Sequence, residues 1–223
     1  MKPWILLASA PIPGGGEMHL WQHVRDFAIR VGRDELMNSG RHGSEDALAS
    51  LAYARLGARA QRRVLVGGLG MGFTAAAALR DLGADGRVTV AELVPAVVEW
   101  NRGPLAQLCG NPLADPRLDV HLGDVADLLR TQTAVYDAIL LDVDNGPHGL
   151  TTSANHWLYG PAGLTRTFRA LRPGGVLGVW SAGPDEAFTR RLGQAGFAVE
   201  CVRTPAHGAR GRKHVIWLGS RGK

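Results

Sequence analysis

From residue 63 to the C-terminus, short apolar runs alternate with segments that read as helices, and few folds accommodate this alternation. Strands that are apolar along their length and separated by helices indicate a parallel sheet covered by helices on both faces. The last two runs are joined by a short turn, so they are expected to pair antiparallel at one edge. The expected strands span 63–68, 87–93, 117–124, 136–142, 172–181, 197–204 and 213–219, and the expected helices lie within 73–83, 94–105, 125–130, 155–171 and 184–196. The sequence therefore predicts an α/β fold with a mostly parallel seven-stranded sheet and an antiparallel edge strand.

The first 43 residues follow a different pattern. The run MKPWILLASA predicts a short strand or a loose terminus rather than a signal peptide, because its apolar stretch is only about six residues long. After the turn PIPGGG, residues 18–31 alternate in places, which favours a short β-hairpin. Ser44 is followed by two acids and an alanine-rich segment, as at an N-capped helix. We therefore predict a short N-terminal β segment over residues 1–43 and a main domain over 44–223.

Composition excludes several classes of protein. The 223 residues are 45% hydrophobic and 20% charged, which is ordinary for a soluble globular chain. No apolar run approaches the roughly 20 residues of a membrane span, so no membrane partner is expected. The two cysteines lie far apart and the eight histidines are scattered, which predicts reduced thiols, a cytoplasmic location and no metal site. The net charge of +5 is concentrated in the C-terminal segment, so nucleic acid is a less favoured partner that stays open.

A glycine-rich loop lies between the first strand and the first helix of the main domain. Gly68, Gly70 and Gly72 form a G-x-G-x-G pattern. Glycines allow a tight turn and a close approach of the backbone to a ligand, and the N-terminus of the helix offers free N–H groups. By itself the pattern is weak, because a tight turn without a ligand has the same appearance.

Acidic residues end the next three strands. Glu92 follows Gly72 by 20 residues, a position from which a carboxylate can accept hydrogen bonds from both ribose hydroxyls. Asp124 ends the third strand and Asp142 the fourth. Each acid alone reads as a helix N-cap, but ligands of open parallel sheets bind at the carboxyl ends of the strands. The series therefore predicts a nucleoside site, and NAD is compatible with it.

The order of these motifs resembles that of class I S-adenosylmethionine-dependent methyltransferases, and within them spermidine synthase and its relatives. The segments that carry the resemblance are VLVGGLGMG, VAELVPAVVEW, LDVHLGDVADLL, YDAILLDVD and LRPGGVLGVW. The resemblance covers roughly residues 20–220 and is strongest over 62–180. It implies a Rossmann-like fold, in which residues 44–223 form the catalytic domain. It also implies S-adenosylmethionine or decarboxylated S-adenosylmethionine as co-substrate, held by the glycine loop.

The resemblance assigns roles to individual residues. Glu92 would hold the ribose, and Asp124, with Val125 alongside, would hold the adenine. Asp142 would take the place of the family's catalytic aspartate. That role makes chemical sense, because an amine must lose a proton before it attacks the carbon bound to the sulfonium, and a carboxylate can accept that proton.

Two positions depart from the family pattern. The family's glycine loop carries an aspartate that contacts the amine of decarboxylated S-adenosylmethionine, and its counterpart here is Gly70. The second aspartate of the family's DxxDP segment falls on Asn145, so Asp144 is the substitute candidate after a shift of one residue. Asp144 also fits a simple turn role.

The sequence offers further, weaker candidates. Gln22 and His23 lie in the N-terminal strand region that closes the pocket in the relatives, and His42, Ser44 and Glu45 lie at the following loop. His148 and His156 flank the segment after Asp142, and Trp180 ends the fifth strand. For each histidine, a surface or structural role is the favoured interpretation. For Trp180, packing in the core is as good an interpretation as contact with the acceptor.

The functional hypothesis is a spermidine-synthase-like transferase that moves an alkyl group to a small, amine-bearing acceptor. Gly70 slightly favours methyl transfer. The alternatives are a genuine polyamine aminopropyltransferase, a nucleoside-binding protein without catalysis, and an RNA methyltransferase that uses the basic C-terminal segment. A homodimer is left open.

Overall fold

The computed structural model describes residues 2–143, 146–147, 157–205 and 213–222. Its strands are β1 (Ile5–Pro11), β2 (Glu17–His23), β3 (Asp26–Val31), β4 (Asp34–Asn38), β5 (Arg63–Gly67), β6 (Arg87–Glu92), β7 (Leu118–Leu122), β8 (Tyr136–Leu141), β9 (Leu171–Ser181), β10 (Ala198–Pro205) and β11 (Lys213–Ser220). Its helices are α1 (Gly43–Leu56), α2 (Phe73–Arg80), α3 (Pro95–Arg102), the 3₁₀ turn η1 (Pro112–Ala114), α4 (Val125–Thr131), α6 (Pro161–Ala170) and α7 (Glu186–Gln194).

The large sheet has seven strands in the order β10-β11-β9-β8-β5-β6-β7. Strands β9, β8, β5, β6 and β7 run parallel to one another, and β11 is antiparallel to both β9 and β10. The predicted α/β class, the seven-stranded sheet and the antiparallel pair are confirmed. The antiparallel strand itself, β11, is second from the edge. From β5 the chain adds β6 and β7 on one side of β5, and it then crosses over to place β8 on the other side of β5. The strand order therefore reverses between β5 and β8, and sheets of this kind bind ligands at such a switch point.

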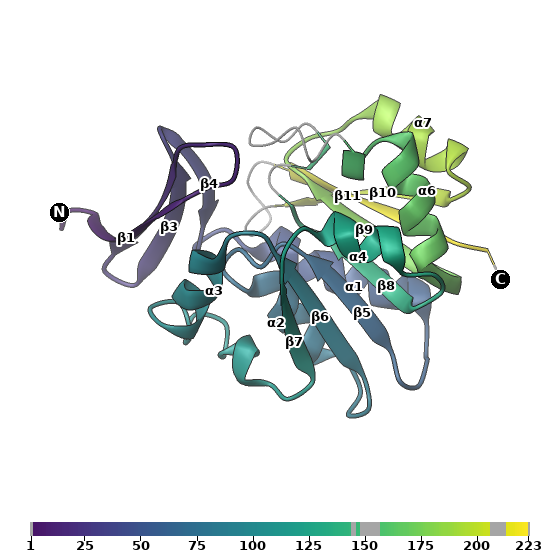
Figure 1. Cartoon of the computed structure of the whole chain (residues 1–223), viewed down its shortest axis with the longest axis horizontal. Helices are drawn as coiled ribbons and strands as arrows, with labels where there is room; N and C mark the ends of the chain where they lie inside the picture. Colours follow the sequence, from purple (N-terminus) through teal and green to yellow (C-terminus); the bar gives the residue numbers. More distant parts are fainter. Residues whose placement is uncertain (1, 144–145, 148–156, 206–212, 223) are drawn as a thin grey trace.

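Helices cover the large sheet on both faces (Figure 1). Helices α1, α2 and α3 share one buried apolar cluster with β5, β6 and β9, and α4, α6 and α7 share a second cluster with the opposite side chains of the same sheet. Strand β8 is buried along its whole length because both clusters enclose it. Such double burial explains its unbroken apolar run.

The N-terminal segment forms a separate sheet rather than the predicted hairpin alone. Strands β1, β2, β3 and β4 pair antiparallel in chain order, with every neighbouring pair hydrogen-bonded (Figure 1). Strands β2 and β3 form the expected hairpin, and β1 falls on the short strand expected in the N-terminal run, whereas β4 was not predicted, because its five residues show no clear alternation. Leu20, Phe27 and Ile29 of this sheet belong to the same apolar cluster as α2 and α3, so the two sheets share a core.

The first helix begins earlier than the sequence predicted. Helix α1 starts at Gly43, and His42 holds the N-cap position, although its side chain does not cap a backbone N–H of the helix. Ser44 is therefore inside the first turn, where it is fully buried, and it is not the N-cap. Glu45 follows it into the interior with 5% of its surface exposed, although acids in a first turn usually face solvent.

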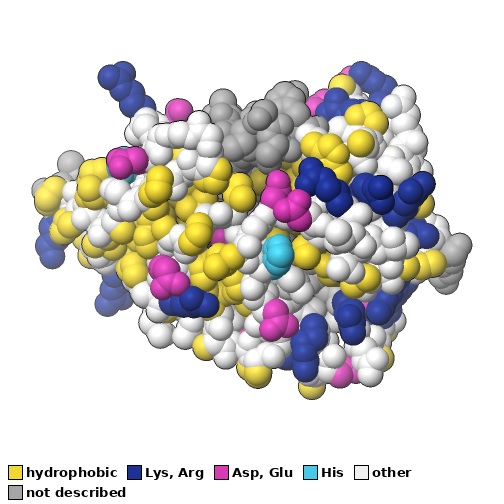
Figure 2. Space-filling view, viewed as in Figure 1, with side chains coloured by type: hydrophobic (Ala, Val, Ile, Leu, Met, Phe, Trp, Pro, Cys, Tyr) yellow, Lys and Arg dark blue, Asp and Glu magenta, His cyan; other side chains and the backbone are white. Residues whose placement is uncertain are grey.

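The surface is apolar over the N-terminal sheet and basic over α6 and α7 (Figure 2). The largest exposed apolar side chains include Ile5, Leu6 and Leu7 of β1. In the basic C-terminal segment, Arg221 donates to the carbonyl oxygens of Phe168 and Leu171, so its guanidinium caps the end of α6. Among the described residues, no helix is both long and apolar enough to cross a bilayer.

Candidate active site

The glycine loop runs from β5 into α2 at the switch point of the sheet. Gly68 has a φ of +89°, and a Cβ atom built on it would lie 2.4 Å from the carbonyl oxygen of Asp142. Only glycine fits there, since both the left-handed backbone and the contact exclude a side chain. Beside this contact, the N–H of Asp142 donates a hydrogen bond of 2.9 Å to the carbonyl oxygen of Gly67. The loop and the end of β8 are therefore in direct contact.

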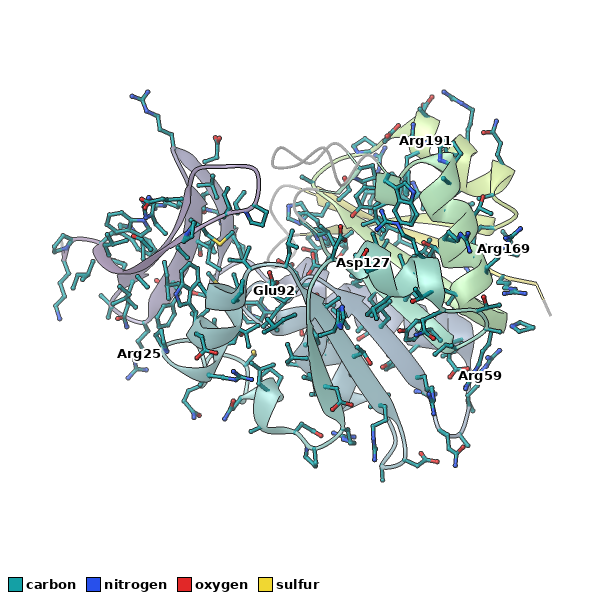
Figure 3. All side chains as sticks on the ribbon, in the orientation of Figure 1. Arg25, Arg59, Glu92, Asp127, Arg169 and Arg191 are labelled. Carbon is teal, nitrogen blue, oxygen red and sulfur yellow. The ribbon has the colours of Figure 1, made fainter. Side chains whose placement is uncertain are left out.

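Glu92 supports the glycine loop from the end of β6. Its Oε2 accepts from the N–H of Leu69 at 2.9 Å, and its Oε1 accepts from the N–H of Val94 at 2.8 Å. The side chain is 7% exposed, and burial raises its pKa while the backbone donors oppose that rise. A carboxylate offers about four lone-pair sites, so both oxygens retain capacity for a ribose hydroxyl. Figure 3 shows Glu92 near the ends of the strands, on the side of the N-terminal sheet.

Asp124 is the N-cap of α4. Its Oδ1 accepts from the N–H of Ala126 at 2.8 Å, so the simple capping interpretation is correct for one of its oxygens. Val125 is buried and packs close to Gly67, where an added Cβ would lie 3.2 Å from its Cγ2. The fold brings Val125 to the glycine loop, and the adenine role of Asp124 and Val125 stays a prediction.

Asp142 lies just beyond the end of β8 and is partly buried. Its Oδ2 accepts from the hydroxyl of Thr74 at 2.6 Å. Burial raises the pKa of Asp142 to about 6, and the Thr74 hydrogen bond opposes part of that rise. Glu45 faces it from α1: burial and repulsion by Asp142 raise the pKa of Glu45 to about 7. Two carboxylates from distant parts of the sequence thus share one environment and compete for protons.

A hydrogen-bonded series extends from Glu45 to β11. The hydroxyl of Ser44 donates to Oε2 of Glu45 at 2.5 Å and lies 2.8 Å from Nδ1 of His214. The ring of His214 packs edge-on against Trp180, with 4.7 Å between centroids. Ser44, Glu45 and Trp180 were weak candidates from the sequence, whereas His214 was not predicted, because it lies on a strand 170 residues after Ser44.

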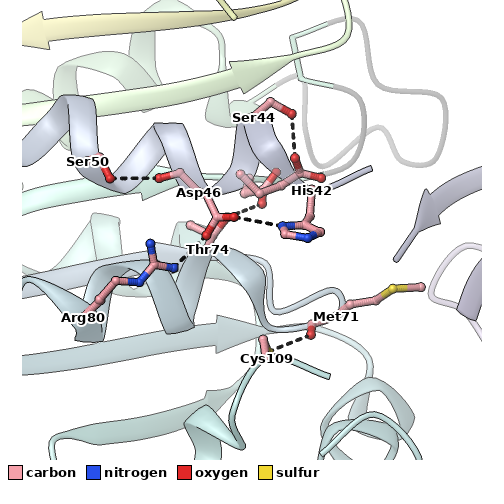
Figure 4. Close-up of polar contacts among 10 residues, drawn as sticks. His42, Ser44, Asp46, Ser50, Met71, Thr74, Arg80 and Cys109 are labelled. Carbon is pink, nitrogen blue, oxygen red and sulfur yellow. Dashed lines mark hydrogen bonds and ion pairs between the residues drawn. The ribbon is translucent and has the colours of Figure 1, made fainter. Parts of the chain in front are cut away.

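A second polar series lies on the other side of α1 (Figure 4). Nδ1 of His42 lies 2.8 Å from Oδ2 of Asp46, whose Oδ1 accepts from Arg80 at 2.8 Å. The His42 ring stacks on Phe73, the first residue of α2, at 4.2 Å between centroids. These contacts fasten the start of α1 to α2.

Met37 of β4 reaches the glycine loop from the N-terminal sheet. Its sulfur lies 3.2 Å from the N–H of Met71, and a Cβ built on Gly70 would lie 2.7 Å from its Cε. The thioether therefore fills the space into which a side chain at position 70 would project. Asn101 of α3 donates to the carbonyl of Gly70 at 2.8 Å and fixes the loop from below. Neither residue carried a sequence signal.

The remaining expected site residues fall outside this geometry. Asp144, Asn145, His148 and His156 lie outside the described residues. Within the described part of the chain, no group of three or more His, Cys, Asp or Glu residues is arranged to hold a metal ion. Thr74 was missed because a threonine in the first turn of a helix has no distinctive pattern.

The fold and the site together define a class. A glycine loop at the switch point, an acid at the end of β6 and another after β8, on a seven-stranded sheet with one antiparallel strand, make up the Rossmann-like fold of class I S-adenosylmethionine-dependent methyltransferases. The family model described as "Spermine/spermidine synthase domain" matches residues 52–184, and the chain belongs to that family.

Individual relatives support the assignment. A polyamine aminopropyltransferase of Mycobacterium tuberculosis is 34% identical over 155 residues, which are 66% of this chain and 28% of that protein. A polyamine aminopropyltransferase of Nitrosomonas europaea is 37% identical over 128 residues, 55% of this chain and 36% of that protein. The chain therefore spans about a third or less of the length of these relatives. A crystal structure of spermidine synthase in complex with the transition-state analogue AdoDATO superposes with a TM-score of 0.80 at 16% identity, covering 97% of this chain and 74% of that one.

Proposed function

We propose that this protein transfers an aminopropyl group from decarboxylated S-adenosylmethionine to a small amine. The family and the curated relatives, which are polyamine aminopropyltransferases, support this reaction. The slight preference for methyl transfer that Gly70 suggested finds no support among these relatives. A solved relative in complex with the transition-state analogue AdoDATO supports a nucleoside donor.

The observation that carries the proposal is the setting of Asp142. An amine must be unprotonated to attack the carbon bound to the sulfonium, and a carboxylate with a pKa of about 6 is ionised at neutral pH yet basic enough to take the proton. Thr74 fixes one carboxylate oxygen, which leaves the other free to orient the acceptor. The glycine loop is in contact with the same residue through its backbone, so donor and acceptor would meet beside it.

Glu92, Asp124 and Val125 complete the proposed donor site. In this proposal Glu92 accepts hydrogen bonds from the ribose hydroxyls while it holds the loop, and Asp124 accepts from the adenine amino group through the oxygen that does not cap α4. Val125 contributes an apolar surface for the base. Gly68, Gly70 and Gly72 keep the backbone close to the donor.

Methyl transfer is the second candidate, and position 70 is the observation that favours it. The family's aspartate at this place contacts the amine of the decarboxylated donor, and here Met37 fills the space instead. An uncharged loop lacks the acid that would repel the carboxylate of S-adenosylmethionine.

The nucleoside product decides between the two reactions. The purified protein is incubated with either donor and a panel of diamines and monoamines, and the products are separated by chromatography. Methylthioadenosine from the decarboxylated donor supports aminopropyl transfer, whereas S-adenosylhomocysteine from S-adenosylmethionine supports methyl transfer. Nucleoside binding without either product would leave only the binding function.

A further inference from the structure

The indole N–H of Trp180 is a buried hydrogen-bond donor. The Trp180 residue is 7% exposed, and among the described residues no acceptor lies within hydrogen-bond distance of its Nε1. Trp217 on β11 is also buried, but its Nε1 donates to the hydroxyl of Thr189 at 2.8 Å. A buried donor without an acceptor destabilises the folded protein, so the N–H of Trp180 requires an explanation.

Trp180 differs from the other buried side chains that carry such a nitrogen. Within the described part of the chain these are Arg62 and Arg191, whose Nε atoms have no partner. Their guanidinium groups still make hydrogen bonds through the terminal nitrogens. Trp180 has a single N–H, so its whole hydrogen-bonding capacity is available to a ligand.

The strand register places Trp180 next to Asp142. The parallel strands β8 and β9 pair Leu141 with Val179. The next residues on the two strands are Asp142 and Trp180, and neighbouring strands lie about 5 Å apart. Leu140 belongs to the same apolar cluster as Trp180. Because side chains alternate along a strand, Asp142 projects from the face of the sheet that carries Leu140 and Trp180.

Polar groups of α1 and β11 adjoin the same place. The His214 ring packs edge-on against Trp180 at 4.7 Å between centroids, and its Nδ1 lies 2.8 Å from the hydroxyl of Ser44. That hydroxyl donates to Glu45 at 2.5 Å. Trp180 is thus connected to Asp142 through the sheet and to Glu45 through two side-chain contacts.

We propose that Trp180 binds the acceptor by donating its indole N–H to a hydroxyl oxygen, and that the acceptor is an amino alcohol. This inference rests on the proposed transfer to an amine, and it names the chemical class of that amine. In this arrangement the amino group of the acceptor lies at Asp142 and the hydroxyl group lies at Trp180.

The chemistry of the reaction leaves a hydroxyl oxygen as the partner of Trp180. The attacking nitrogen gives its proton to Asp142 and uses its lone pair to form the N–C bond, while the C–S bonding pair leaves with sulfur. A second amino group is an ammonium ion at neutral pH, which donates hydrogen bonds and accepts none. A carboxylate accepts hydrogen bonds, but the two nearby acids, Asp142 and Glu45, would repel it. A hydroxyl is neutral, accepts from Trp180 and retains a hydrogen to donate.

Three amines with the same carbon chain test the proposal: aminobutanol, butylamine and diaminobutane. With decarboxylated S-adenosylmethionine as donor, the kcat/KM of the native protein should be roughly 10-fold higher for aminobutanol than for either of the other amines. Trp180→Phe keeps an aromatic ring but removes the N–H, so the values for aminobutanol and butylamine should become equal. A native protein that prefers diaminobutane, or a Trp180→Phe variant that retains the native ratio, would overturn the proposal.

Trp217→Phe is the matched control. It removes the other buried indole N–H, which belongs to the apolar cluster on the opposite face of the sheet and donates to Thr189. We expect this variant to lose stability and to keep the native ratio between aminobutanol and butylamine. A ratio that falls equally in Trp180→Phe and Trp217→Phe would show a general effect of core disruption and would refute the assignment.

A second test needs neither turnover nor a variant that must fold. Methylthioadenosine fills the donor site, and NMR of isotope-labelled native protein records the indole N–H signal of Trp180, assigned through its proximity to the His214 ring. Aminobutanol should move this signal downfield and slow its exchange with solvent, because the N–H gains an acceptor, whereas butylamine should not. A signal that responds equally to both amines, or to neither, would show that the hydroxyl does not bind Trp180.

The two tests separate this inference from the proposed function. If the native protein alkylates no amine with either donor, the proposed function fails, and the acceptor role of Trp180 fails with it. If diaminobutane is alkylated and aminobutanol is not favoured, the proposed function stands and only the assignment of an amino alcohol is overturned.

Discussion

The hydroxyl of Thr74 donates a hydrogen bond of 2.6 Å to Oδ2 of Asp142. Thr74 lies in the first turn of α2, directly after the glycine loop, and Asp142 follows the last residue of β8. The contact joins the element that would hold the donor to the group that would take the acceptor's proton. A change at either residue should therefore alter the chemistry without loss of the fold.

Asp142→Asn should lower kcat by ~10²–10⁴, because the amide keeps the shape of the side chain but cannot accept a proton. The affinity for the nucleoside product should remain unchanged, since only the backbone of residue 142 contacts the glycine loop. Steady-state kinetics and calorimetry with methylthioadenosine measure the two effects. Native turnover in the variant would refute the role of Asp142 as base.

Thr74→Val should shift the acid limb of the pH–rate profile upward. The hydrogen bond from Thr74 stabilises the ionised form of Asp142, so its loss raises the pKa of Asp142 from about 6 by roughly one pH unit. Thr74→Ser keeps the hydroxyl and should retain the native profile. If the valine and serine variants have the same profile, the hydrogen bond does not tune the base.

Glu92→Gln should weaken nucleoside binding by about 1–3 kcal/mol, the range for hydrogen bonds to a charged group. The amide turns a donor toward one of the two backbone N–H groups that Glu92 now accepts from, so the loop loses support as well. Titration calorimetry measures the affinity, and Glu99→Gln on the exposed face of α3 is the control. Equal affinities of the two variants would remove Glu92 from the donor site.

The pair Gly70→Asp and Met37→Ala tests donor preference. An aspartate at position 70 meets the end of the Met37 side chain, so Met37→Ala is needed to make room for it. The new carboxylate should attract the ammonium of the decarboxylated donor and repel the carboxylate of S-adenosylmethionine, and so raise the affinity ratio about 10-fold. Met37→Ala alone supplies the baseline. No change in the ratio means that position 70 does not face the donor's tail.

Stability should fall as the pH rises from about 3.8 to about 7. The folded-state pKa values of Glu45 and Asp142 are raised to about 7 and about 6, so between their unfolded and folded pKa values the folded state binds more protons than the unfolded one. The pair thus contributes stability that is complete at low pH and is lost as pH rises through those values. Glu45→Gln should flatten this fall in thermal unfolding scans, whereas Asp34→Asn at the N-terminal sheet should not; an unchanged slope in Glu45→Gln would contradict the shifted pKa values.

The sequence by itself determined the main fold and the donor half of the site. Apolar runs such as that of β8 must be buried on both faces, and burial of that kind requires a helix-covered parallel sheet. Strand ends of a parallel sheet meet at one edge, so Glu92 and Asp142 were predictable as neighbours of the glycine loop. The four-stranded N-terminal sheet was not predictable, because its register depends on pairing partners and on the shared core around Leu20 rather than on its own periodicity.

Only the tertiary structure decided the surroundings of Asp142. Ser44 and Glu45 read as a solvated cap and first turn, and their burial follows from the packing of α1 against α2 and β9. Met37 lies 33 residues before Gly70 in the sequence, and His214 lies 72 residues after Asp142. At such sequence separations the local pattern carries no information about contacts. The pKa of a carboxyl group depends on its burial and on nearby charges and hydrogen bonds, and these are properties of the folded structure. The sequence pattern therefore located Asp142, but its raised pKa comes from tertiary packing that the pattern does not show.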